Sequence, residues 1–176
     1  MRLPDAVNRD SRTFSPSVVA DGSVYFTQPE ADQYHIFRAA FRDGAYQPPV
    51  RQALGDPAAQ QNDPSVAPDE SFIVFAAKEA GKDGPDRLYI AFRDGDHWGV
   101  PVDLGPEINQ GRPWGAHLGP DHRTLYFNSD RTAPVTYPRT PEQAKDALTD
   151  SGSWNSGGVG IWGISLAPWL DAHSGG

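Results

Sequence analysis

The sequence contains no cysteine, which excludes disulfide bonds and any function that depends on a thiol. It has no apolar run long enough to span a membrane, and residues 1–5 lack the apolar segment of a signal peptide. Basic residues are few, because 15 Lys and Arg stand against 23 Asp and Glu, for a net charge of −8. Nucleic acids and anionic membranes bind clustered positive charge, so this balance argues against both partners.

The chain has instead an abundance of turn-forming and aromatic residues. Its 176 residues include 18 Gly and 17 Pro, and 11% are aromatic. This mixture favours many short strands joined by turns over long helices. The length is that of one domain, large enough to bury about 70% of the surface that the unfolded chain exposes.

The middle of the chain has the pattern of one antiparallel sheet. Apolar and β-branched segments alternate with turn residues, and Asp94-Gly95 is a typical hairpin turn. The segment 71–77 is apolar on both faces, as expected for a strand that is covered on both sides. The pattern predicts four strands, at 63–67, 71–77, 86–93 and 97–104.

The same pattern recurs before and after this sheet. Turn residues Asp21, Asp69 and Asp121 are 48 and 52 positions apart, and a similar apolar triplet follows each of them. A period near fifty with four strands in each unit is typical of the blades of a β-propeller. We therefore expect an all-β chain that forms one domain, 1–176, of about three four-stranded antiparallel sheets, with units at 14–55, 63–105 and 112–166.

These units resemble the TolB-type, WD-repeat-like β-propeller family. The matching motifs cover nearly the whole chain, and they stand at 64–69, 94–98, 104–109 and 125–131. The resemblance implies a propeller fold and a periplasmic or extracellular location, and it transfers no catalytic residue. Glu70 and His122 replace the turn glycine of the family, so we expect those two turns to be of another type.

Three blades are too few for a closed propeller, which typically has about 4–8. Residues 1–8 resemble 104–109, so we expect 1–8 to be the outer strand of an adjoining or last blade. No fourth strand for the third unit is evident in residues 167–176, which follow it. Open blade flanks associate readily. Two alternatives follow: a homodimer that closes a six-bladed ring, or one half of a longer single-chain propeller.

The third unit contains a long insertion, residues 131–158. Within it, Thr140, Pro141 and Gln143 are typical of a helix start, which predicts a short helix from Pro141 to about Leu148. In a propeller this insertion would stand over the face on which blades are connected, where ligands commonly bind. The alternative is a surface loop without a binding role.

The sequence offers no recognisable catalytic, metal or cofactor site. The five histidines lack metal-ligand spacing, and the repeated carboxylates at Asp69, Asp94, Asp121 and Asp130 are better explained by turns. No nucleophile elbow or phosphate-binding loop is present. We therefore predict no catalytic residue, no metal and no cofactor.

Four residues form the binding hypothesis: Trp114, Asp130, Arg131 and Trp154. Trp114 has no aromatic counterpart in the other units by this alignment, and Trp154 lies in the insertion. Two such aromatics on one face could stack on a sugar or hold a peptide. The alternatives are core packing for Trp114, a loop anchor for Trp154 and an exposed ion pair for Asp130 and Arg131.

The function that these observations favour is non-catalytic binding, by a propeller scaffold that presents loops to a protein or glycan partner. One alternative is part of a propeller hydrolase or lyase, acting on carbohydrate or peptide, whose catalytic groups are not identifiable in this chain. Another is a structural role, in which the blades cap or gate a further domain. The absence of a unique acid, base or nucleophile favours binding.

Overall fold

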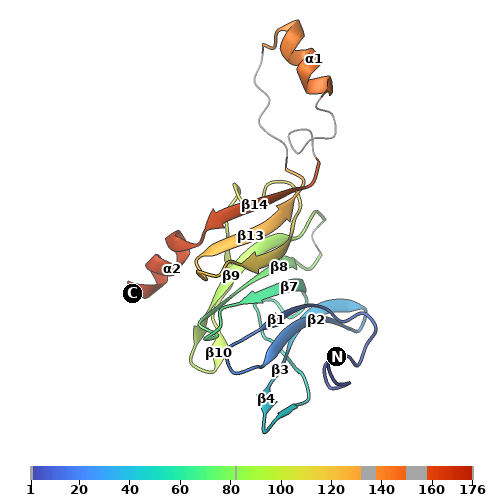
Figure 1. Cartoon of the computed structure of the whole chain (residues 1–176), viewed down its shortest axis with the longest axis vertical. Helices are drawn as coiled ribbons and strands as arrows, with labels where there is room; N and C mark the ends of the chain where they lie inside the picture. The colour runs from blue at the N-terminus through green and yellow to red at the C-terminus, as the bar shows by residue number, and fades with distance from the viewer. Residues whose placement is uncertain (1, 82, 132–137, 150–157, 176) are drawn as a thin grey trace.

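The chain forms three antiparallel sheets that lie side by side, with two short helices outside them (Figure 1). This computed structural model describes residues 2–81, 83–131, 138–149 and 158–175. The fold class is therefore confirmed as all-β. No described helix is both long enough and apolar enough to cross a membrane.

The first sheet has the strand order β1-β2-β3-β6, and a separate hairpin, β4-β5, extends from it. Neighbouring strands are antiparallel, and β2 pairs with β3 along its whole length. Short connections between consecutive strands produce this meander. The bounds are β1 Phe14–Val18, β2 Val24–Glu30, β3 Gln33–Ala39, β4 Phe41–Arg42, β5 Ala45–Tyr46 and β6 Val50–Arg51.

The second sheet has the order β10-β9-β8-β7, and β11 also pairs with β9. The prediction of one continuous fourth strand at 97–104 was wrong, because this segment is divided into β10 and β11. Pro101 stands between them, and proline has no N–H to donate to β9. The bounds are β7 Gln60–Val66, β8 Phe72–Lys78, β9 Arg87–Asp94, β10 His97–Trp98 and β11 Val102–Asp103.

The third sheet has three strands, β12 Pro113–Leu118, β13 Thr124–Ser129 and β14 Gly160–Ser165. Helix α2, Ala167–Ser174, follows β14, and the sequence pattern did not predict it. Proline in the first turn favours a helix start, and this signal was present at Pro168.

Helix α1 lies between β13 and β14, where the insertion was predicted to contain a helix. It spans Pro141–Thr149 and begins with a capping box. The Gln143 N–H donates to Thr140 Oγ1 at 3.2 Å, and the Thr140 N–H donates to Gln143 Oε1 at 2.9 Å. The predicted helix start is therefore confirmed in its capping chemistry.

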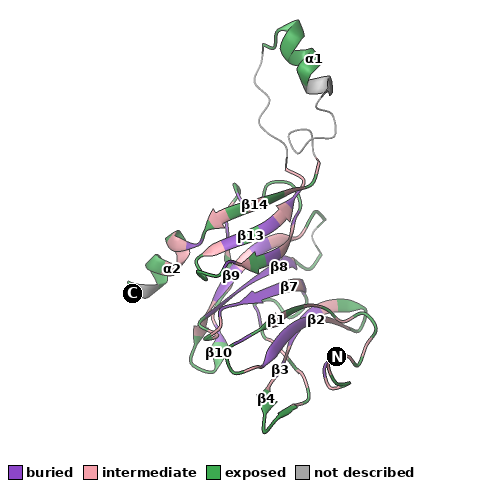
Figure 2. Cartoon of the chain, viewed as in Figure 1, coloured by how far each residue is buried: buried purple, intermediate pink, exposed green. Residues whose placement is uncertain are grey.

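The three sheets pack face to face through two apolar seams, which are buried in Figure 2. We call the seam between the first and second sheets the first seam, and the seam between the second and third sheets the second seam. Each buries side chains of the central strands; Tyr25 and Phe75 lie in the first seam, and Val74 and Phe127 lie in the second. The first strands of the sheets form the inner edge of the fan, where β7 contacts both β1 and β12.

Residues 5–7 form a turn, and none of residues 2–8 lies in a strand of this chain, where an outer strand was predicted. The N–H groups of Val7 and Asn8 both donate to the Pro4 carbonyl. Leu3 and Val7 pack on the outer flank of the first sheet, against Val24 and neighbouring residues. A strand needs a partner edge for its ladder hydrogen bonds, and none lies beside this segment within the described residues.

Candidate binding site

The innermost strands share an irregularity near the end of the fan that carries the insertion. Phe14, Asn62 and Trp114 occupy equivalent positions, and the next residue in each strand has a positive φ, of 51° at Ser15, 51° at Asp63 and 61° at Gly115. Each strand shifts its register by a β-bulge at this point. A bulge turns the strand end and re-aims its side chain.

This comparison corrects the expectation that Trp114 has no aromatic counterpart, because Phe14 holds the equivalent position in the first sheet. The sequence already contained this match, because Phe14 and Trp114 each stand seven residues before a repeated turn aspartate, Asp21 and Asp121. The backbone pairing, Ser17 with Tyr25 and His117 with Tyr126, establishes it.

Asp63 joins all three sheets at the inner edge. Its carboxylate accepts a hydrogen bond from the Ser15 hydroxyl and another, of 3.0 Å, from the Gly115 N–H. Its own N–H donates to Thr27 Oγ1 at 3.1 Å. The carboxylate therefore has two donors from neighbouring sheets, and these bonds compensate for its left-handed backbone conformation.

A groove of about 640 Å³ opens beside these strand starts, between the second sheet and the start of the third. Trp114 is half-buried in its wall, so part of the indole ring is accessible. Charged and amide side chains surround it, which gives the groove both signs of charge. The lining residues are Gln60, Lys78, Gly84, Pro85, Asp86, Arg112, Pro113, Trp114 and Val159.

Asp130 lies at the edge of this groove, held by Arg112. Its carboxylate accepts hydrogen bonds from Arg112 Nε at 2.6 Å and from the Arg112 N–H at 2.7 Å. The Arg112 side chain, and next its N–H, hold the pKa of Asp130 below its usual value. Because Asp130 fixes a groove-lining arginine, its role is to position that side chain.

Arg131 does not line the groove. Its guanidinium carbon lies 3.3 Å from the centroid of the Trp162 ring, and Nη1 donates to the Glu107 carbonyl at 3.0 Å. Partial burial lowers the pKa of Arg131. Trp154 lies outside the described residues. Of the four predicted residues, the structure thus brings together Trp114 and Asp130, through Arg112, and places Arg131 on another aromatic ring.

Sequence reasoning missed Gln60, Lys78, Asp86 and Arg112. All four stand at strand starts or ends on the insertion side, as Trp114 does. The available signal was this common placement, since antiparallel strands put the start of β7, the end of β8 and the start of β12 at one end of the sheets. Charge type alone could not separate these residues from other exposed ones.

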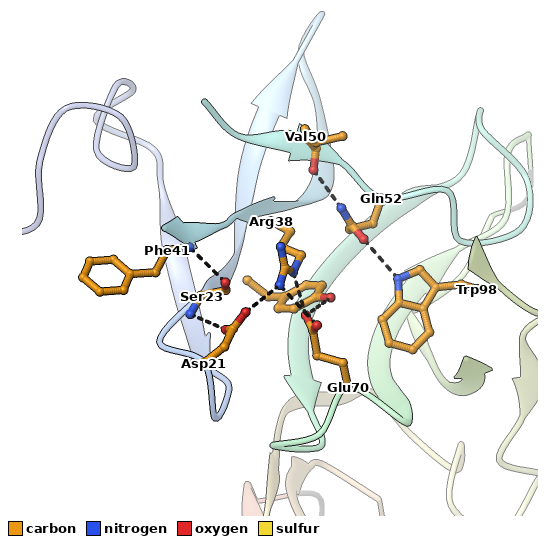
Figure 3. Close-up of polar contacts among 9 residues, drawn as sticks. Asp21, Ser23, Arg38, Phe41, Val50, Gln52, Glu70 and Trp98 are labelled. Atoms are coloured by element: carbon orange, nitrogen blue, oxygen red, sulfur yellow. Dashed lines mark hydrogen bonds and ion pairs between the residues drawn. The ribbon is translucent and has the colours of Figure 1, made fainter. Parts of the chain in front are cut away.

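A second polar cluster lies in the first seam (Figure 3). Glu70 accepts hydrogen bonds from the Tyr25 hydroxyl at 2.6 Å and from Arg38 Nε at 2.6 Å, and Arg38 Nη2 also reaches Asp21 at 3.2 Å. Burial, and next the bond to Glu70, raise the pKa of Tyr25. The Arg38 and Glu70 side chains are only 19% and 21% exposed, so this cluster ties two sheets together and is no open site.

The turns at Glu70 and His122 keep the conformation of the glycine that they replace. Their φ angles are 59° and 53°, against 84° at Gly22. The expectation of another turn type was therefore wrong. At Glu70 the side-chain bonds to Arg38 and Tyr25 favour this residue despite the strained backbone.

A smaller groove, of about 350 Å³, lies at the other end of the sheets beside α2. His173 stacks on Phe92 there with ring centroids 4.0 Å apart, and Arg123 pairs with Asp171. In the part of the chain that the structure describes, no three His, Cys, Asp or Glu side chains are grouped to hold a metal ion.

Comparison with known proteins identifies the fold. No protein family model matches the chain, and no curated protein sequence matches it. Among solved structures, a protein of Agrobacterium tumefaciens provisionally assigned as TolB is similar, with a TM-score of 0.52 and 15% sequence identity. The match covers 90% of this chain and 52% of that chain. The chain thus has a TolB-like propeller fold and spans about half the length of that protein.

Proposed function

We propose that the chain is a non-catalytic binding domain, and that its groove beside Trp114 holds a protein or glycan partner. The observation that carries this proposal is a partly exposed tryptophan, Trp114, in the wall of a groove of about 640 Å³ that Lys78, Asp86 and Arg112 border. An aromatic face supplies apolar contact area, and the surrounding donors and acceptors orient the bound group. This combination suits the apolar face of a sugar ring or a polar peptide segment.

Two carboxylates near the groove hold structural groups, which supports binding over hydrolysis, and Asp86 in the lining accepts a hydrogen bond from Asn62 Nδ2 at 3.1 Å. Asp63 accepts hydrogen bonds from Ser15 and Gly115, and Asp130 accepts two from Arg112. A general acid or base needs a proton that can move to or from a substrate, whereas these two groups hold the backbone and an arginine. The resemblance to TolB-type repeats extends the proposal to a periplasmic or extracellular location, which cell fractionation would test.

Screening the chain against a glycan array and a peptide library tests the proposal. For a ligand found in either library, Trp114→Ala should weaken binding by about 10- to 30-fold, because an interface aromatic contributes about 2 kcal/mol. Phe41→Ala is the matched control, since Phe41 is 38% exposed on the β4-β5 hairpin and lines no part of the groove. It should leave the affinity unchanged.

Ionic strength distinguishes the two kinds of partner. A charged peptide that pairs with Lys78 or Asp86 should bind more weakly as salt rises, and a neutral glycan should not. Equal affinities of the wild type and Trp114→Ala for every ligand found would place the binding surface elsewhere. Absence of any ligand in both libraries would contradict the proposed function.

A further inference from the structure

The outer flank of the third sheet presents residues that the other two sheets bury. Ile36, Leu88 and Ile161 occupy equivalent positions in the third strands of the sheets. They pair with Thr27, Ala76 and Asn128, which hold the same place in the second strands. Ile36 and Leu88 are fully buried against the next sheet, whereas Ile161 is 79% exposed. The third sheet therefore displays a seam surface with no sheet packed on it within the described residues.

Tyr126 extends this surface. It is equivalent to Tyr25 and Val74, which are fully buried in the two seams, yet it is 46% exposed. Its ring lies between two glycines; a Cβ at Gly119 would be 3.1 Å from the ring and a Cβ at Gly163 would be 3.2 Å from it. The absence of side chains at these glycines lets the ring lie across the sheet, which keeps the flank flat enough for another sheet.

The first sheet displays the complementary half of a seam. Val66 and Leu118 pack against the sheet before their own, and their equivalent in the first sheet, Val18, is 64% exposed. On the same sheet, Val7 packs against Val24 and Phe26 of the central strand, as Ile108 packs on the third sheet. The molecule therefore ends in two unlike flanks, and each matches one side of an interface that the chain already forms twice.

The same hydrogen bond crosses both seams, and it aligns the first strands of neighbouring sheets. Ser17 Oγ accepts the Val66 N–H at 3.0 Å across the first seam, and Ser65 Oγ accepts the Leu118 N–H at 2.8 Å across the second. The next acceptor position in this series is His117, which is exposed on the third sheet. The next donor position is Val18, on the first sheet.

We propose that two copies of this chain associate head to tail, so that the third sheet of each packs on the first sheet of the other. The contact would place His117 of one copy against Val18 of the second and would cover Tyr126 and Ile161. Two identical contacts related by a two-fold axis close a ring of six sheets, whereas three sheets are fewer than the typical 4–8 of a closed propeller. The match to about half of the TolB-like chain fits a half-ring.

Cysteine cross-linking tests the contact directly, because the chain has no native cysteine. The double variant Val18→Cys/His117→Cys should form a disulfide-linked dimer on oxidation, seen at twice the mass of 19.1 kDa on a non-reducing gel. Either single variant should remain mostly monomeric on the gel. The pair Ser17→Cys/Val66→Cys, at the equivalent place within one chain, is the positive control and should cross-link without a change in mass.

Solution mass gives an independent readout. The wild type should sediment as a dimer at micromolar concentration, and Ile161→Asp should be a monomer with an unchanged far-UV circular dichroism spectrum. Val100→Asp is the matched control, because Val100 is 87% exposed but lies on neither flank, and this variant should stay dimeric. A monomeric wild type, a dimeric Ile161→Asp variant, or a mass that grows beyond the dimer with concentration would each overturn the proposal. None of these readouts depends on the groove beside Trp114.

Discussion

Glu70 shows at the scale of one residue how a side chain can outweigh backbone strain. Its positive φ is unfavourable for any residue with a Cβ, by about 1 kcal/mol relative to glycine. Against this stand the bonds from Arg38 and Tyr25, which are charge-assisted and mostly shielded from water. The family resemblance indicated glycine at this position, and the residue that replaces it bonds to two side chains of the first sheet across the first seam.

Two substitutions separate these opposing effects. Glu70→Ala should lower the free energy of unfolding by about 2–3 kcal/mol, because it leaves Arg38 and Tyr25 without their acceptor and keeps the strain. Glu70→Gly should lower it by about 1 kcal/mol less, since glycine adopts a positive φ freely. Urea titration measures both. If the glycine variant is no more stable than the alanine variant, strain at this turn is negligible.

Glu70 also shows which part of this turn the sequence could predict. The turn itself was predictable from Pro68-Asp69, and the role of Glu70 was not. Its partners lie 45 and 32 positions earlier in the chain, and only the packing of two sheets brings them together.

Turns are the element that the repeat conserves most clearly within the chain. The carboxylates of Asp21, Asp69 and Asp121 each accept the N–H of the second residue after them. At Asp121 the Thr124 hydroxyl, and next the N–H groups of Arg123 and Thr124, lower the pKa to about 2 from 3.8. Local hydrogen bonds of this kind are encoded in adjacent residues, which explains why the turns could be predicted from sequence.

Acid should weaken the Asp121 turn in a defined range of pH. Because its pKa is lower in the folded chain, the turn contributes stability above the unfolded value of 3.8, and this contribution is lost as the pH falls through about 2. The melting temperature of Asp121→Asn should therefore fall less than that of the wild type between pH 4 and pH 2.

A second variant tests the cause of this shift. Thr124→Val removes the largest contribution to the lowered pKa, so its loss of stability should begin at a higher pH than in the wild type. Circular dichroism melts across the pH range measure all three chains. Parallel melting curves for the wild type and Asp121→Asn would show that other carboxylates control the acid response.

Elements beyond the repeat were predicted unevenly. Helix α1 was predictable, because its capping box lies in four consecutive residues. Helix α2 was missed, because the repeat led us to seek a fourth strand there and Pro168 was not weighed as a helix start. The fourth strand is divided at Pro101 because proline has no N–H, and the pattern of apolar residues alone does not show this break.

At the scale of the whole molecule, α2 closes one end of the second seam. Trp169 and Leu170 pack against the core between the second and third sheets. Trp169→Ala should lower the free energy of unfolding by about 2 kcal/mol, below the values for fully buried tryptophans because Trp169 is half-buried. Asp171→Ala removes only an exposed ion pair with Arg123 and should change it by less than about 1 kcal/mol. Equal losses in the two variants would mean that α2 does not support the seam.

The arrangement of the sheets could be predicted because turn and apolar residues recur at equivalent positions of each unit. The groove could not be predicted in this way. Its lining comes from the second sheet, the loop before β9, the start of β12 and Val159 before β14, and the repeat assigns no common chemistry to these places. Trp114 was selected for being unmatched, yet Phe14 matches it. The feature that distinguishes Trp114 is its position in the groove wall, which depends on how two sheets meet.

The bulges at the inner edge have a consequence for how such a chain can diversify. Each bulge lies between one side chain of an inner strand, that of Phe14, Asn62 or Trp114, and the registered pairs that build the seams. Phenylalanine, asparagine and tryptophan already occupy this place on three nearly identical backbones. Under the proposed binding function, exchange of single residues there would change the specificity while the packing that holds the sheets together stays the same.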